Sequence, residues 1–111
     1  MKARIFHNPR CSKSREALAL LEAAGAEVEI VEYLKTPPGR AELQGLYARA
    51  GMTARQGLRM SEDAAKPLKG AAEDAILDAM IANPILIERP LVETDKGVWL
   101  GRPPALIHEI L

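Results

Sequence analysis

The feature that most constrains this sequence is a strand, a helix and a second strand within roughly its first thirty residues. Residues 3–7 are short and apolar-leaning and stop at an Asn-Pro pair, which indicates a strand followed by a turn. Residues 14–24 are rich in Ala, Leu and Glu, which favour helix, and Gly25 follows where a helix commonly ends. Residues 27–33 carry the apolar residues of a second strand. The pattern predicts a βαβ unit with two parallel strands.

The middle of the chain is expected to be helical. Apolar residues recur at i, i+3, i+4 and i+7 over residues 43–50, and Gly51 ends that helix. Thr53 is a candidate N-cap for a short helix over residues 53–58. A longer helix is expected over about residues 71–82, where an Asn-Pro pair follows.

Alternation with period two returns near the end of the sequence. Residues 91–94 and 98–100 flank a glycine-containing turn at 95–97, which predicts a β-hairpin. A last helix is expected from Pro103, since proline is favoured in a first turn. The resulting order, βαβ then a helical insert then ββα, is that of an α/β, thioredoxin-like fold. We expect one domain over 1–111, with a small mixed four-stranded sheet and flanking helices.

Composition limits the classes of function. Fifteen Lys or Arg balance fifteen Asp or Glu, so the formal net charge is zero, which argues against nucleic acid as a partner. No apolar run exceeds the five residues 17–21, so we expect no membrane association and a cytoplasmic protein. The one cysteine, Cys11, excludes an internal disulfide and a zinc site of several thiolates, and we expect no metal.

Cys11 falls between the first strand and the first helix. Unpaired N–H groups and the helix dipole at such a position favour the thiolate, which is the nucleophilic form. Ser14 adds a hydroxyl and Arg15 a positive charge nearby. Because N–H groups at a helix start also bind oxyanions, the segment predicts a thiolate that attacks a bound oxyanion. The alternative is a small, inert apolar cysteine.

His7 ends the first strand. An imidazolium there would lower the pKa of the Cys11 thiol if the two side chains lie close together, and the alternative is a half-exposed strand-end residue. One enzyme class is set aside directly. Tyrosine-phosphatase loops need an arginine at a fixed distance after the cysteine, and this chain has Ala17 at that position.

Four segments in order resemble the glutaredoxin-coupled arsenate reductase family: residues 7–15, 33–38, 83–90 and 101–103. The first looks like the family's signature around its catalytic cysteine, which falls on Cys11. Each segment alone is a modest signal, but the four together extend over nearly the whole chain.

The resemblance implies that three arginines bind the oxyanion, and they fall on Arg59, Arg89 and Arg102. All three positions hold arginine in this chain. In thioredoxin-like folds a cis-proline precedes the third strand and faces the cysteine, and Pro90 matches that place.

The resemblance further implies the reaction. The Cys11 thiolate attacks arsenate or a similar small oxyanion, His7 and Ser14 stabilise the thiolate, and Arg15 supports the loop. Glutathione is the implied co-substrate and glutaredoxin the implied partner, with no tightly bound cofactor.

Two alternatives stay open. The first is a glutathione-dependent thiol/disulfide reductase of unknown substrate. The second is a non-catalytic regulator of the same fold that binds RNA polymerase. The best-known such regulators carry Cys-x-x-Cys at this loop, whereas this chain has Ser14 at the second position.

Overall fold

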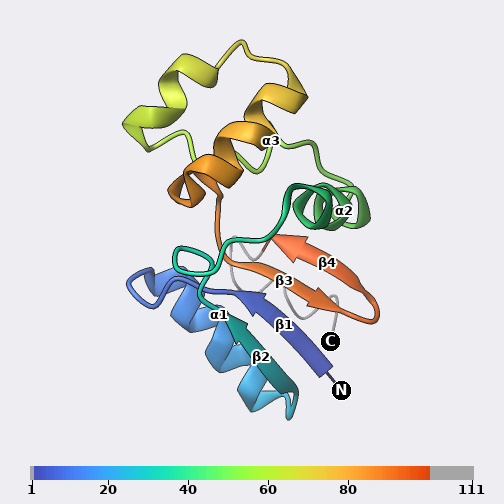
Figure 1. Cartoon of the computed structure of the whole chain (residues 1–111). Helices are drawn as coiled ribbons and strands as arrows, with labels where there is room; N and C mark the ends of the chain where they lie inside the picture. Colours follow the sequence, from blue (N-terminus) through green and yellow to red (C-terminus); the bar gives the residue numbers. More distant parts are fainter. Residues whose placement is uncertain (1, 101–111) are drawn as a thin grey trace. The chain divides into compact units, whose positions relative to one another are not determined.

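The computed structural model describes residues 2–100, which form two compact units (Figure 1). Residues 2–36 and 89–100 make up the first, which we call the sheet unit. Residues 37–88 make up the second, the helical unit. Arg102 and the helix expected from Pro103 lie outside the described residues.

The sheet unit is built on four strands in the order β2-β1-β3-β4. β1 (Lys2–Phe6) pairs in parallel with β2 (Glu27–Val31) and antiparallel with β3 (Leu91–Thr94). β4 (Gly97–Leu100) closes the sheet as the antiparallel partner of β3. The mixed four-stranded sheet that the sequence predicts is confirmed, and the parallel β1–β2 pair confirms the βαβ unit.

The helix α1 (Ser12–Ala23) lies against the sheet (Figure 1). Its Ala17 and Leu21 side chains pack with apolar side chains of the strands. Leu21 has no exposed surface, and burial of one leucine contributes about 1.5–3 kcal/mol. Gly25 follows the C-cap residue Ala24 and terminates the helix as predicted, with a φ of 79° in the left-handed region. Its N–H donates to Glu22 O and the next N–H, of Ala26, donates to Leu21 O, which satisfies two terminal carbonyls. The buried cluster comprises Ala3, Ile5, Ala17, Leu21 and Val92.

The helical unit contains α2 (Arg40–Ala50) and α3 (Glu73–Ala82). Two 3-10 helices accompany them: η1 (Asp63–Leu68) and η2 (Pro84–Leu86). The sequence patterns predict α2 and α3 but neither 3-10 helix. Both contain a proline, which removes a backbone donor and obscures the helical period.

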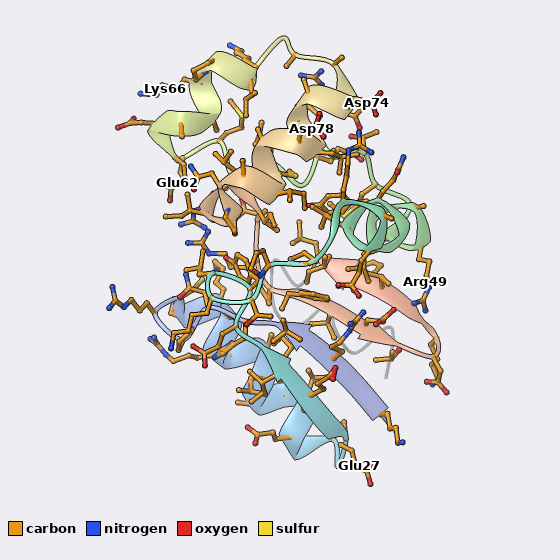
Figure 2. All side chains as sticks on the ribbon, in the orientation of Figure 1. Glu27, Arg49, Glu62, Lys66, Asp74 and Asp78 are labelled. Carbon is orange, nitrogen blue, oxygen red and sulfur yellow. The ribbon has the colours of Figure 1, made fainter. Side chains whose placement is uncertain are left out.

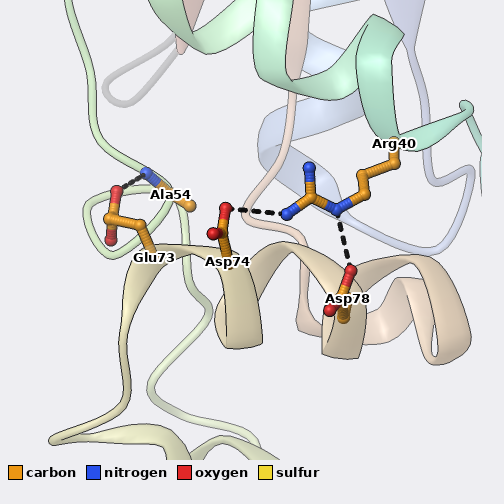
Figure 3. Close-up of polar contacts among 5 residues, drawn as sticks. All are labelled: Arg40, Ala54, Glu73, Asp74 and Asp78. Atoms are coloured by element: carbon orange, nitrogen blue, oxygen red, sulfur yellow. Dashed lines mark hydrogen bonds and ion pairs between the residues drawn. The ribbon is translucent and has the colours of Figure 1, made fainter.

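Side-chain contacts join α2 to α3. The Tyr47 hydroxyl donates to Met80 Sδ at 3.8 Å in the buried layer. At the surface Arg40 donates from Nη2 to Asp74 and from Nε to Asp78, each at 2.8 Å (Figure 3). The two aspartates lie on successive turns of α3 (Figure 2). Their hydrogen bonds, Asp78 first, raise the pKa of Arg40.

The prediction of a short helix over residues 53–58 is wrong, because these residues form a turn and a β-bridge. Thr53 does act as a cap, because the Gln56 N–H donates to its Oγ1 at 3.2 Å. After one turn, however, Leu58 forms an antiparallel bridge with Ile87. Both side chains are buried, so pairing between distant segments overrides the local helical signal.

Candidate active site

Cys11 occupies the N-cap position of α1. Its backbone is extended (φ −93°, ψ 120°), and its carbonyl accepts the Arg15 N–H at 3.0 Å to begin the helix. The Cys11 N–H donates to Asn8 O at 3.0 Å, so both sides of its backbone are held. The side chain is partly exposed, so the sulfur combines a fixed position with access from outside.

The surroundings lower the pKa of Cys11. Burial is the largest influence and raises it, but the backbone N–H groups of Ser14 and Lys13 together with the Arg89 guanidinium outweigh burial. Arg89 acts on the sulfur both through its charge and through a hydrogen bond. The thiolate is therefore favoured by a helix N-terminus and one arginine, and the thiolate is the nucleophile.

Ser14 and His7 form a buried hydrogen-bonded pair behind the cysteine loop. Ser14 Oγ lies 2.7 Å from His7 Nδ1 and accepts the Asn8 N–H at 3.1 Å. Ser14 has no exposed surface and His7 only 6%. The serine hydroxyl thus joins the residue that follows β1, the loop and the first turn of α1.

His7 has a lowered pKa. Burial is the main cause, Glu32 opposes it, and the positive charge of Arg15 adds to it. The neutral imidazole is therefore the favoured form near neutral pH. His7 orders Ser14, whereas the cationic help to the thiolate comes from Arg89.

Two further contacts shape the loop before α1. Arg15 donates from Nη1 to Pro9 O at 2.8 Å, and the Arg10 N–H donates to Asn8 Oδ1 at 3.0 Å. Asn8 is buried, and the sequence places it in a turn and in the segment 7–15 without predicting a contact for its side chain. Asparagine bonding to the backbone two residues on is the signal that could have singled it out.

Arg89 belongs to the sheet unit with Cys11. It is 5% exposed, and the peptide bond that joins it to Pro90 is cis. The structure therefore brings together Cys11, His7, Ser14, Arg15 and Arg89, all of which the sequence analysis singled out.

Arg59 belongs to the helical unit. Its guanidinium pairs with Glu62 at 3.3 Å and with Glu88 at 3.0 Å. The sequence analysis missed both glutamates, because Glu88 is distant in sequence and an acidic partner i+3 is common on any surface. Arg102 lies outside the described residues.

Among residues 2–100, no three His, Cys, Asp or Glu side chains are grouped so that they could hold a metal ion. Within the same range, no helix has the length and apolar character needed to cross a membrane.

A mixed four-stranded sheet with α1 packed on it, and one cysteine at the start of that helix, defines a thioredoxin-like protein. The ArsC family model matches residues 6–110, and the chain belongs to the ArsC family.

The matches to related proteins cover nearly all of this chain. The arsenate reductase of Rhizobium meliloti (strain 1021) is 43% identical, over 100% of this chain and 82% of its own length. The uncharacterized protein YfgD of Escherichia coli (strain K12) is 45% identical, over 99% and 97%. Among solved structures, the arsenate reductase from Vibrio cholerae aligns with a TM-score of 0.93 at 42% identity, over 100% of this chain and 98% of that one.

Proposed function

We propose that this protein is an arsenate reductase whose nucleophile is the Cys11 thiolate. The observation that carries the proposal is the lowered pKa of Cys11 at the start of α1, with the Arg89 guanidinium beside it. Attack on an anionic centre needs an activated thiolate and a fixed cation. The relatives named arsenate reductase support arsenate as the substrate.

Arg59, Arg89 and Arg102 are proposed to bind the oxyanion. Guanidinium groups give planar, paired donors that suit a tetrahedral oxyanion, and they keep their charge at any working pH. The support is the match of all three positions to the family's arginines and, for Arg89, its interaction with Cys11.

In the proposed reaction the Cys11 sulfur forms a bond to arsenic, and one arsenate oxygen is protonated and leaves as water. A glutathione thiolate then attacks the Cys11 sulfur. The electron pair of the sulfur–arsenic bond stays on arsenic, which passes from pentavalent to trivalent and leaves as arsenite. Because the chain has one cysteine, the disulfide that remains joins Cys11 to glutathione, and glutaredoxin removes that glutathione.

The test is arsenate-dependent oxidation of NADPH in the presence of glutathione, glutathione reductase and glutaredoxin. Wild-type protein should turn over arsenate, and Cys11→Ser should lose all turnover. Turnover that survives in Cys11→Ser would contradict the mechanism, and turnover without glutaredoxin would contradict the proposed electron donor.

The same assay separates the alternatives. Disulfide exchange with glutathione but no arsenate turnover would favour a thiol reductase of another substrate. Stoichiometric capture of RNA polymerase subunits by a protein without either activity would favour the regulator.

A further inference from the structure

The Arg59 guanidinium lies between two carboxylates. Its Nε donates to Glu62 Oε1 at 3.3 Å, and its Nη1 donates to Glu88 Oε1 at 3.0 Å. A guanidinium has five N–H donors, so two bonds leave three for a ligand. Within residues 2–100 the structure gives Nη2 no hydrogen-bond partner.

The backbone holds this cluster in place. Leu58 and Ile87 form an antiparallel bridge, in which the Arg59 N–H donates to Leu86 O and the Glu88 N–H to Gly57 O, each at 2.8 Å. Because side chains alternate along such a pair, Arg59 and Glu88 point away from the side on which Leu58 and Ile87 are buried.

The cluster is sheltered from solvent compared with other ion pairs of the helical unit. The side chains of Arg59, Glu62 and Glu88 are 22%, 29% and 21% exposed. The nearby Lys66–Asp63 pair is 72% and 94% exposed, so water screens it far more strongly. The two glutamates therefore act on Arg59 and on any ligand it binds with a force that solvent only partly reduces.

We propose that Glu62 and Glu88 are positioning residues that set specificity at Arg59: they orient its guanidinium and favour monoanionic over dianionic oxyanions. This inference rests on the proposed role of Arg59 in oxyanion binding. Each carboxylate repels a bound anion in proportion to the anion's charge, so a dianion loses twice as much binding free energy as a monoanion.

Glu62 is a better residue than Glu88 to substitute in a test of this proposal. Glu88 makes a further interaction, whereas within the described residues the Glu62 carboxylate has Arg59 as its one cationic partner. Glutamine keeps an oxygen that can accept from Arg59 Nε, so Glu62→Gln removes the charge and keeps the orientation.

The experiment measures binding of two tetrahedral anions that differ in charge, sulfate and perchlorate, by calorimetry at one pH. It uses full-length protein that carries Cys11→Ser, so that binding is read without reaction. Glu62→Gln should tighten sulfate roughly tenfold and perchlorate about threefold, so that the ratio of the two affinities rises about threefold. Glu88→Gln should shift the ratio in the same direction.

Asp63→Asn is the matched control. It removes the same charge at the position next to Glu62, but from the exposed Lys66–Asp63 pair, which water screens. It should leave the ratio unchanged. Arg59→Ala should weaken sulfate in the same background, and thermal unfolding checks that every variant is folded.

The outcomes separate the two hypotheses. If Arg59→Ala leaves sulfate binding unchanged, the proposed oxyanion role of Arg59 fails and this inference fails with it. If sulfate binding needs Arg59 but Glu62→Gln changes both anions equally, or no more than Asp63→Asn does, this inference alone is overturned.

Discussion

At the scale of single residues, one set of groups at the site stabilises the Cys11 thiolate and another set holds the loop in its conformation. Arg89 stabilises the thiolate by its charge and a hydrogen bond, and the backbone N–H groups of Lys13 and Ser14 stabilise it by hydrogen bonds. Ser14 and His7 are buried and hold the loop in shape through their mutual hydrogen bond of 2.7 Å and through the Asn8 N–H, which donates to Ser14 Oγ at 3.1 Å. Substitutions in the first set should therefore change the pKa of Cys11, and substitutions in the second set should change the stability of the fold.

Arg89→Gln should raise the pKa of Cys11, because it removes a cation whose charge and hydrogen bond both favour the thiolate. The rate of alkylation by iodoacetamide, measured against pH, reports this change as a shift of the profile to higher pH. Arg10→Gln removes an exposed arginine that has no such contact and is the control. Equal shifts in the two variants would contradict the assignment.

Ser14→Ala should lower the free energy of unfolding by about 1–2 kcal/mol, because it leaves the buried Asn8 N–H without its acceptor. Ser12→Ala, at an exposed hydroxyl of the same helical turn, should change it by less than about 0.5 kcal/mol. Urea unfolding at neutral pH measures both. Losses of equal size would show that Ser14 has no special structural role.

His7 predicts a pH dependence of stability. Its pKa is lowered in the folded protein, so the unfolded chain takes up the proton first as pH falls below the ordinary value of 6.5. The stabilising contribution of His7 is fully present above that value and is lost as pH falls toward the folded pKa. Urea midpoints at pH 7.5 and 5.5 should differ more for wild type than for His7→Asn. An equal difference would contradict the coupling.

At the scale of elements, local sequence patterns predicted the helices and strands that depend on interactions between residues close together in the sequence. Gly25 ends α1 as expected, and the period-two segments form β3 and β4. The helix expected over residues 53–58 failed because the bridge between Leu58 and Ile87 joins segments far apart in sequence. The cysteine loop was predictable because its residues are close together in the sequence. The contact of Glu88 with Arg59 was not, because it joins residues far apart in the sequence.

Gly57 and Gly45 give a matched pair in the helical unit. A Cβ at Gly57 would lie 2.5 Å from the buried Tyr47 ring, so Gly57→Ala should destabilise by about 2 kcal/mol or more. A Cβ at Gly45, inside α2, meets nothing within 4 Å, so Gly45→Ala should stabilise by about 0.5–1 kcal/mol. Urea unfolding measures both, and changes of the same sign would contradict the prediction.

At the scale of the whole molecule, zero net charge coexists with a local excess of positive charge. Arg10, Lys13 and Arg15 lie beside Cys11 in sequence, and Arg89 contacts it. The balance therefore argues against a polyanionic partner but is compatible with a small oxyanion.

The single domain expected over 1–111 stays a prediction, and unfolding tests it. Trp99, in β4, reports on the sheet unit, and far-UV circular dichroism reports mainly on helices. If the chain is one cooperative domain, the two urea transitions should coincide. Loss of helical signal at lower urea than the Trp99 transition would show that the helical unit unfolds separately.

The junction between Glu88 and Arg89 has a consequence for how this sequence can diverge. Glu88 contacts Arg59, and the next residue along the chain contacts Cys11. Each residue is therefore committed to a contact inside its own unit, Glu88 in the helical unit and Arg89 in the sheet unit. A substitution at either position removes a contact, whereas the side chains of the turn at residues 34–37 are exposed to solvent. Sequence variation among descendants of this chain should therefore accumulate at that turn and spare the junction.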